Sequence, residues 1–192
     1  MKIVRIIGGI NKGRKLVGLG KGDPSAHLRP TSDRVRESIF NLIISGRFGN
    51  KLENCFTLDL FAGTGALGLE ALSRGAKSVV FVDNGKYAIQ LLKKNISICD
   101  VKNQAKVIRA DATKELPTLC KDSFDLIFID PPYGKGLGQQ TLKILDKCEL
   151  LSQETLIILE ESQQINFIEN FNIEVCRRYG GSYAHFLIPN IK

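Results

Sequence analysis

Tryptophan is absent from this sequence, which has one methionine and two histidines, His27 and His185. The five cysteines are scattered and form no C-x-x-C pair, so the clustered ligands that a zinc site needs are missing. An odd number of widely spaced cysteines is typical of free thiols in a reducing compartment. No Ser/His/Asp or Cys/His arrangement indicates a nucleophile, and we interpret His185 as structural. We therefore expect no metal site.

Long apolar runs are also absent. The longest, such as Leu126–Ile129 and Leu156–Leu159, are far shorter than the roughly 20 residues that a membrane-spanning helix needs. Residues 1–5 place charge inside their apolar run and provide no signal-peptide core. Hydrophobic residues make up 43% of the 192 positions and charged residues 24%, which is typical of one globular domain. We expect a cytoplasmic, monomeric protein without a membrane partner.

The net charge of +7 is concentrated at one end of the chain. Residues 1–48 contain ten Lys or Arg and three acids, whereas the remaining residues contain 17 of each kind. Such an excess predicts a polyanionic partner, because each cation near a phosphate can release a condensed counterion. From charge alone, a solvated basic surface is an equally open alternative. The candidate phosphate ligands are Lys12, Arg14, Lys15, Arg29, Arg34 and Arg36.

This basic segment has predicted elements of its own. Ile3–Ile7 and Arg14–Val17 flank a glycine-rich turn and predict a β-hairpin. Residues 31–33 then offer an N-cap to a helix whose apolar residues fall at helical spacing. Arg34 and Arg36 cannot both lie on the apolar stripe of that helix. We therefore expect both to flank the stripe and to stay available to phosphate.

From residue 57 onward, short apolar runs alternate with helical stretches. Near-continuous apolar strands separated by helices predict an α/β fold with a mostly parallel sheet, buried on both faces. The last two runs are joined by a glycine turn and predict an antiparallel hairpin that completes the sheet. The predicted strands are Thr57–Phe61, Ser78–Val82, Lys106–Ala110, Phe124–Ile129, Leu156–Leu159, Ile173–Arg178 and Tyr183–Ile188. The predicted helices are Ala66–Arg74, Tyr87–Cys99 and Gln139–Lys147, with a further short one over 162–170.

The first of these strands ends in a glycine-rich turn, Asp59-Leu-Phe-Ala-Gly63-Thr-Gly65-Ala-Leu-Gly68. Glycines at such a turn let the backbone approach a ligand without Cβ clashes. Asp83 follows Gly65 by eighteen residues, where an acid can accept both hydroxyl protons of a ribose. This spacing matches the dinucleotide fingerprint and by itself leaves NAD open.

Two further acids favour S-adenosylmethionine over NAD. Asp59 would face a pyrophosphate unfavourably, but it suits the ammonium of a cationic ligand that has no phosphate. Asp111 follows the third strand, where a carboxylate can hold an adenine amine. The alternative is that these acids are loop and cap residues of an ordinary doubly wound sheet. The candidate cofactor residues are Asp59, Phe61, Gly63, Gly65, Asp83, Asn84, Asp111 and Ala112.

The fourth strand runs into the tetrapeptide Asp130-Pro131-Pro132-Tyr133, the candidate catalytic motif. Prolines remove backbone donors and fix φ, so the local carbonyls point outward as acceptors. An exocyclic amine of a nucleobase could donate to the Asp130 carboxylate and to the Pro131 carbonyl, while Tyr133 stacks on the base. Acceptors on both amine protons favour the nucleophilic geometry of a nitrogen whose lone pair is otherwise delocalised. The alternative is a Pro-Pro turn after a buried strand.

Together, Asp-x-Phe-Ala-Gly-Thr-Gly and Asp-Pro-Pro-Tyr resemble the motifs of amino-methyltransferases with a Rossmann-like core. Further motifs resemble one family among them, the bacterial 16S ribosomal RNA guanine-N2 methyltransferases. These motifs are Arg5-Ile-Ile-Gly-Gly9, Gly13-Arg-Lys-Leu16, Leu28-Arg-Pro-Thr-Ser-Asp-Arg-Val-Arg-Glu-Ser-Ile-Phe40, Gly65-Ala-Leu-Gly-Leu-Glu-Ala-Leu-Ser-Arg-Gly-Ala76 and Arg178-Tyr-Gly-Gly-Ser182. The resemblance covers nearly the whole chain, and residues 18–27 are the least constrained part.

The resemblance implies a seven-stranded methyltransferase sheet with Asp83 on the cofactor ribose and Asp111 near its adenine. It implies action on a small-subunit rRNA loop near the peptidyl site, in naked 16S rRNA, the assembled subunit or an assembly intermediate. Residues 1–48 would then dock RNA and 49–192 would form the methyltransferase core, within a single structural domain. The segment that holds Arg29, Thr31, Arg34 and Glu37 would lie over the cofactor cleft. Other enzymes of the superfamily have Asn in place of Asp130, and the Asp favours guanine N2.

Three other functions are weighed against this hypothesis. A DNA adenine or cytosine amino-methyltransferase is disfavoured because the chain is too short to contain a separate target-recognition domain. A non-catalytic rRNA-binding assembly factor would not need the acids or the motif at 130–133. A nicotinamide-dependent dehydrogenase would bind NAD at the same turn.

Overall fold

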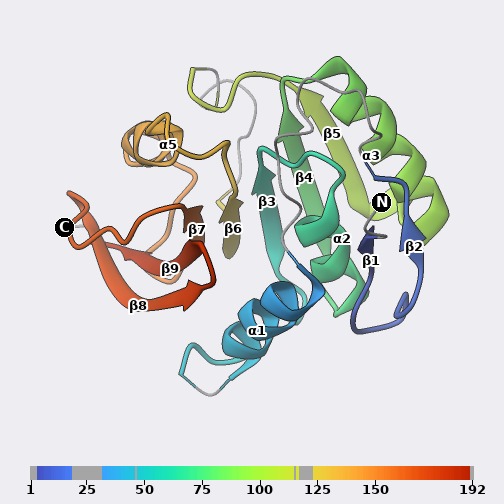
Figure 1. Cartoon of the computed structure of the whole chain (residues 1–192), viewed down its shortest axis with the longest axis horizontal. Coiled ribbons are helices and arrows are strands. Elements are labelled where there is room, and N and C mark those ends of the chain that lie inside the picture. Colours follow the sequence, from blue (N-terminus) through green and yellow to red (C-terminus); the bar gives the residue numbers. More distant parts are fainter. Residues whose placement is uncertain (1–3, 19–31, 46, 115, 117–122, 191–192) are drawn as a thin grey trace.

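The computed structural model describes residues 4–18, 32–45, 47–114, 116 and 123–190 (Figure 1). It contains a seven-stranded sheet with the order β5-β4-β3-β6-β7-β9-β8 and a two-stranded sheet, β1-β2. From β5 to β7 neighbouring strands are parallel, whereas β9 is antiparallel to both β7 and β8. The strands are β1 (Val4–Arg5), β2 (Lys15–Leu16), β3 (Phe56–Leu60), β4 (Ser78–Asp83), β5 (Ala105–Arg109), β6 (Leu126–Ile129), β7 (Leu156–Glu161), β8 (Phe171–Tyr179) and β9 (Ser182–Pro189). The helices are α1 (Asp33–Ile44), α2 (Ala66–Ser73), α3 (Lys86–Cys99), the 3-10 turn η1 (Lys102–Gln104) and α5 (Leu137–Leu145).

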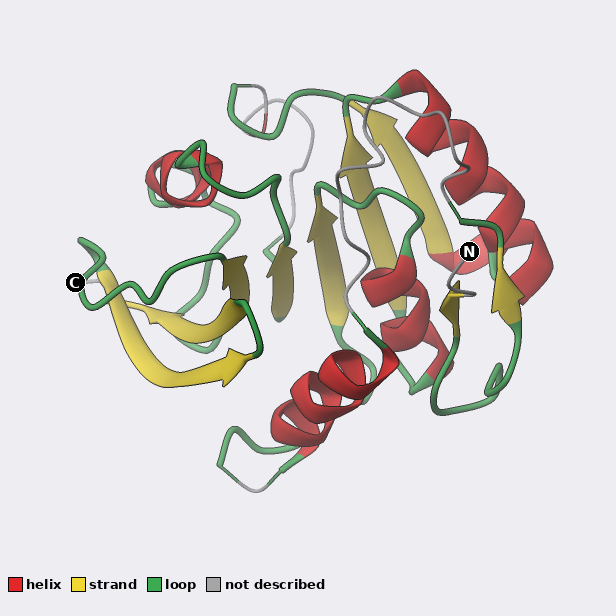
Figure 2. Ribbon diagram, viewed as in Figure 1, coloured by secondary structure: helices red, strands yellow, loops and turns green. Residues whose placement is uncertain are grey.

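Helices cover both faces of the large sheet (Figure 2). On one face, the apolar sides of α1, α2 and α3 pack in one buried cluster with Phe81 and Phe128 of the sheet. On the other face, Leu142 and Leu145 of α5 pack in a second cluster with Leu58 of β3. Every residue of β6 and β7 is buried, as expected for parallel strands that are covered on both sides.

The predicted α/β fold with a mostly parallel seven-stranded sheet is confirmed, including the antiparallel C-terminal hairpin. The N-terminal hairpin is also present, although its ladder is limited to two residues in each strand. Ser32 caps α1, because its side chain accepts a hydrogen bond from the Val35 amide. Among the described residues, no helix has the length and hydropathy needed to cross a bilayer.

The short helix predicted over 162–170 is wrong. This segment is irregular and ends in an isolated bridge between Ile168 and Phe171. The Ile165 amide donates a hydrogen bond of 2.9 Å to Nε2 of His185, which connects the segment to β9. The His185 ring is fully buried, and burial lowers its pKa, so the ring is a neutral acceptor. The interpretation of His185 as structural agrees with this contact.

Helix α2 anchors the N-terminal basic segment. The fully buried carboxylate of Glu70 accepts hydrogen bonds from the amides of Ile7 and Gly8, each at 2.7 Å. The same carboxylate forms an ion pair with Arg74 at 2.6 Å. Gly9 has φ +73, and a Cβ there would lie 1.7 Å from the Ser73 carbonyl oxygen. Only glycine allows this close approach at position 9.

Candidate functional site

The strand register aligns the carboxyl ends of the central strands at one edge of the sheet. Leu60 of β3 pairs with Val82 of β4 and with Ile129 of β6, and Val82 pairs with Ile108 of β5. Because these strands are parallel, the segments that follow them leave the sheet at the same edge. The chain passes from β3 to β4 on one side, and β6 lies on the other side of β3. Ligands of doubly wound sheets bind at such a reversal of strand order.

At this edge, Asp83 connects two loops. One carboxylate oxygen accepts a hydrogen bond from the Gly63 amide at 2.8 Å, and the other accepts from the Gly85 amide at 2.7 Å. Each oxygen of a carboxylate can accept more than one hydrogen bond, so these contacts leave acceptor capacity for a diol. The half-buried Asp83 therefore fits its predicted place beside a ribose, with the exposed Asn84 next to it.

The glycine-rich turn is shaped by backbone strain and close packing. Phe61 has φ +60 and Gly63 has φ +55, so the chain reverses through left-handed conformations directly after β3. A non-glycine residue in this region is rare and often marks a functional site. A Cβ at Gly65 would lie 2.3 Å from Leu92 of α3. Gly65 therefore lets Leu92 pack closely against the start of α2, and its φ of +79 also favours glycine.

Asp59 lies inside β3 and is 2% exposed. Its carboxylate accepts a hydrogen bond from the Gly68 amide at 2.9 Å, in the first turn of α2. Burial raises the pKa of Asp59 to about 7; the Gly68 bond opposes this shift and the charge of Asp83 adds to it. The Asp59 carboxylate therefore supports the glycine-rich turn, and its contact with a ligand ammonium stays a prediction.

Asp111 lies two residues beyond the end of β5 and is held in a defined orientation. Its Oδ1 atom accepts from the amide of Thr113 at 3.0 Å and from the Thr113 hydroxyl at 2.6 Å. These bonds, with the smaller effect of Lys114, lower the pKa of Asp111, so it is ionised. The neighbouring Ala112 is buried. An oriented, half-buried carboxylate at this position fits the predicted contact with an adenine amine.

The motif at 130–133 follows β6 at the same edge, where the Asp130 amide donates to the Leu60 carbonyl at 3.5 Å. Pro131 is buried and Pro132 is half-buried, whereas Tyr133 is 40% exposed. The Tyr133 hydroxyl donates to Oε1 of Glu160 in β7 at 2.7 Å, and the Ser182 hydroxyl donates to the same atom at 3.2 Å. The tyrosine ring is therefore anchored at its hydroxyl end.

Burial, followed by the charges of Glu160 and Asp130, raises the pKa of Tyr133. The phenol therefore stays protonated and acts as a donor. Glu160 is 4% exposed, and the sequence analysis did not single it out. The available signal was a Glu-Glu pair at the end of the apolar run Leu156–Leu159, at the carboxyl end of a parallel strand.

The predicted phosphate ligands are in different environments. Lys12, Arg14 and Lys15 are exposed on the β1-β2 hairpin, and Arg34 is exposed on α1. The prediction that Arg36 stays available to phosphate is wrong, since this side chain is 1% exposed. Its guanidinium donates to the Arg5 carbonyl at 2.6 Å and to Asp33 at 2.9 Å. Arg29 lies outside the described residues.

Comparisons with known proteins identify relatives of this chain. A family model described as conserved hypothetical protein 95 matches residues 4–188. Ribosomal RNA small subunit methyltransferase D of Escherichia coli (strain K12) is 38% identical over 157 residues, which cover 82% of this chain and 74% of that protein. YlbH of Bacillus subtilis, provisionally named an rRNA methyltransferase, is 38% identical over 168 residues, or 86% of each chain. The solved structure of Escherichia coli YhhF, provisionally named a methyltransferase, has a TM-score of 0.83 and 31% identity, with full coverage of both chains.

The resemblance to the small-subunit rRNA methyltransferase family is thereby confirmed. The family, its relatives and the fold support S-adenosylmethionine as the cofactor, in place of the NAD that the glycine spacing alone left open. With a family model matched over residues 4–188 and relatives matched over most of its length, the chain belongs to the conserved hypothetical protein 95 family of methyltransferases.

Proposed function

We propose that this enzyme transfers a methyl group from S-adenosylmethionine to the exocyclic N2 amine of a guanine in 16S ribosomal RNA. The observation that carries the proposal is the placement of the Asp130–Tyr133 motif beside the glycine-rich turn, at the carboxyl edge of the sheet. Relatives named as small-subunit rRNA methyltransferases support the substrate class. The substrate is 16S rRNA, either naked, in the small ribosomal subunit or in one of its assembly intermediates.

The residues present at this edge fit the cofactor. Asp83 would hold the ribose, Asp111 would accept from the adenine amine, and the turn at Gly63 would lie along the ligand. The three carboxylates at this edge, those of Asp83, Asp111 and Asp130, suit a cationic ligand without phosphate. When bound, S-adenosylmethionine supplies an electrophilic methyl group on a sulfonium, which is an excellent leaving group.

The motif orients and activates the base. The Asp130 carboxylate and the Pro131 carbonyl accept the two amine protons, which localises the nitrogen lone pair for in-line attack. The exposed face of Tyr133 stacks on the flipped guanine, while Glu160 keeps the ring in place through the hydroxyl. Asp130 then takes the proton that the amine loses.

The decisive experiment is the transfer of labelled methyl groups from S-adenosylmethionine to small ribosomal subunits that lack base methylation, followed by nucleoside analysis. We expect label in N2-methylguanosine. Label on adenine would retain the fold and cofactor but overturn the guanine assignment, and methylation of DNA only, in a parallel assay, would favour a DNA amino-methyltransferase. Tight rRNA binding without transfer would favour the assembly factor. The shift in melting temperature on addition of NAD or of S-adenosylmethionine distinguishes a dehydrogenase from a methyltransferase.

A further inference from the structure

A second cationic surface lies outside the N-terminal segment. Residues 86–109, which form α3, η1 and β5, contain six Lys or Arg and one acid, Asp100. Residues 49–192 have no net charge as a whole, but most of their acidic residues lie after residue 109, so residues 86–109 are locally basic. All six cationic residues are exposed. They are Lys86, Lys93, Lys94, Lys102, Lys106 and Arg109.

The β1-β2 hairpin is bonded directly to this surface. The Val17 amide donates to Oδ1 of the buried Asn95 at 2.7 Å, and the Asn95 amide returns a bond to the Val17 carbonyl at 3.0 Å. Arg14 donates from its guanidinium to the Ile98 carbonyl of α3. Figure 1 shows β2 running alongside α3. The hairpin that carries Lys12, Arg14 and Lys15 is therefore held against α3.

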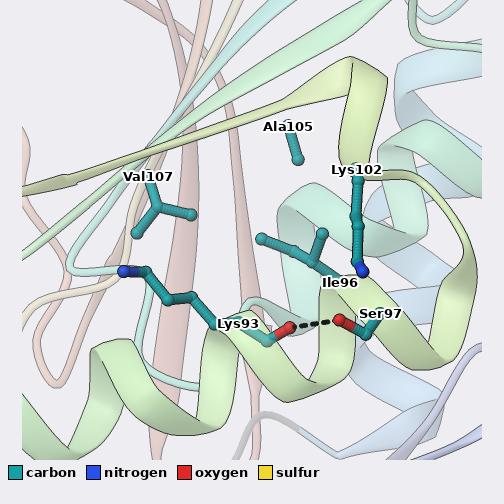
Figure 3. Close-up of a pocket in the computed structure, with 6 residues that line it drawn as sticks. All are labelled: Lys93, Ile96, Ser97, Lys102, Ala105 and Val107. Atoms are coloured by element: carbon teal, nitrogen blue, oxygen red, sulfur yellow. Dashed lines mark hydrogen bonds between the residues drawn. The ribbon is translucent and has the colours of Figure 1, made fainter.

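Between α3 and the edge strand β5 there is an open pocket. It is lined by Lys93, Ile96, Ser97, Lys102, Ala105 and Val107. Figure 3 shows the side chains of Lys93 and Lys102 on either side of Ile96, with Ala105 and Val107 opposite. In the part of the chain that the structure describes, the ion pairs involve neither lysine. Two exposed ammonium groups thus flank an apolar floor without an acidic partner.

We propose that the surface formed by Lys93, Lys94 and Lys102 binds the phosphate backbone of the RNA substrate and extends the docking surface of the hairpin. This inference rests on the proposed RNA substrate. Helix α3 starts beside Asp83 at the cofactor edge and runs about 20 Å away from it. A strand that enters the site can follow this helix, with its phosphates on the lysines and its sugars over the apolar floor.

The test compares two double variants that each remove two exposed lysines. Lys93→Gln/Lys102→Gln changes the residues that flank the pocket. Lys143→Gln/Lys147→Gln is the matched control, because it lowers the net charge equally on the α5 side of the sheet. Binding of labelled 16S rRNA transcript is measured without cofactor over a range of salt concentrations. Methyl transfer to unmethylated subunits is measured in parallel.

For Lys93→Gln/Lys102→Gln we expect a roughly tenfold weaker affinity for RNA at physiological salt. The slope of log affinity against log salt should fall by about 1.4 to 1.8, since each lost phosphate contact removes about 0.7 to 0.9. The KM for RNA should rise, with kcat and cofactor affinity unchanged. The control variant should keep the salt slope of the unmodified protein.

Equal losses of RNA affinity in the two double variants would show that net charge alone causes the effect. That result would overturn the proposal. An unchanged salt slope would do the same. Failure of the proposed function is a separate result. In that case the unmodified protein places no methyl group on rRNA, while the binding comparison still decides whether this surface holds phosphate.

Discussion

The hydroxyl of Tyr133 donates a hydrogen bond of 2.7 Å to Oε1 of Glu160, across 27 positions of sequence. The bond joins the loop after β6 to the end of β7. Ser182, in the C-terminal hairpin, donates to the same oxygen atom at 3.2 Å. The Arg178–Ser182 turn therefore supports the candidate catalytic motif through a buried carboxylate.

Replacing Tyr133 with Phe or Glu160 with Gln should lower kcat several-fold and leave cofactor affinity unchanged, because each change loosens the stacking ring. The combined variant should lose less activity than the sum of the single losses, since Tyr133→Phe removes the hydrogen bond whose acceptor loses its charge in Glu160→Gln. The energetic coupling of the two residues is measured from single-turnover methylation rates of the unmodified protein, the two single variants and the double variant. Additive losses would contradict a role of Glu160 through Tyr133. Glu161→Gln, one position along β7, is the control and should keep full activity.

Asp130→Ala should lower kcat by roughly 100-fold or more, because it removes an acceptor for the amine and the base for its proton. The affinity for S-adenosylmethionine should change by less than about twofold. Steady-state kinetics and calorimetric titration of the cofactor check the two parts. An Asp130→Ala variant with full activity would show that Asp130 has no role in the reaction.

Asp83→Ala should weaken cofactor binding at least about tenfold, because it removes the proposed ribose acceptor and frees the amides of Gly63 and Gly85. Calorimetric titration with S-adenosylmethionine measures the loss. Asp125→Ala is the matched control, because Asp125 also accepts from a backbone amide, that of Phe56, but at the opposite end of the sheet. Equal cofactor affinity in the two variants would exclude Asp83 from the binding site.

Asp59 should make stability depend on pH. Its pKa is about 7 in the folded chain against an ordinary 3.8, so between these pH values the folded chain holds a proton that the unfolded chain has released. The free energy of unfolding should therefore fall as pH rises from about 4 to 7, by at most about 4 kcal/mol from this group. Asp59→Asn keeps the shape without the titration. Urea unfolding at several pH values should show a flatter profile for the variant; parallel profiles would refute the shift.

Gly9→Ala should destabilise the docking of the hairpin by more than about 2 kcal/mol, because a Cβ at this position meets the Ser73 carbonyl oxygen. Gly13→Ala is a matched control, since Gly13 also has a positive φ, +85, but has open space around it. The control should lose only about 1 kcal/mol, the cost of the left-handed backbone. Thermal unfolding compares the two variants, and equal losses would show that backbone strain alone requires Gly9.

The sequence by itself determined the sheet and the location of the site. Near-continuous apolar runs such as Leu126–Ile129 can be buried only on both faces of a sheet, and the helical stretches between them impose parallel connections. Parallel connections place the ends of successive strands at one edge. The glycine-rich turn, Asp83, Asp111 and the motif at 130–133 could therefore be assigned to one site from their spacing.

Only the tertiary structure decided which of these side chains face solvent and which distant residues meet. Helical spacing places Arg36 beside an apolar stripe, but its burial depends on Asp33 and on the Arg5 carbonyl, which another segment supplies. The contact of Glu160 with Tyr133, and of the hairpin with α3, joins residues far apart in the chain. A local sequence pattern reflects secondary-structure propensity and periodicity. The burial of a side chain and its hydrogen-bond partners depend on the packing of segments that are distant in the sequence.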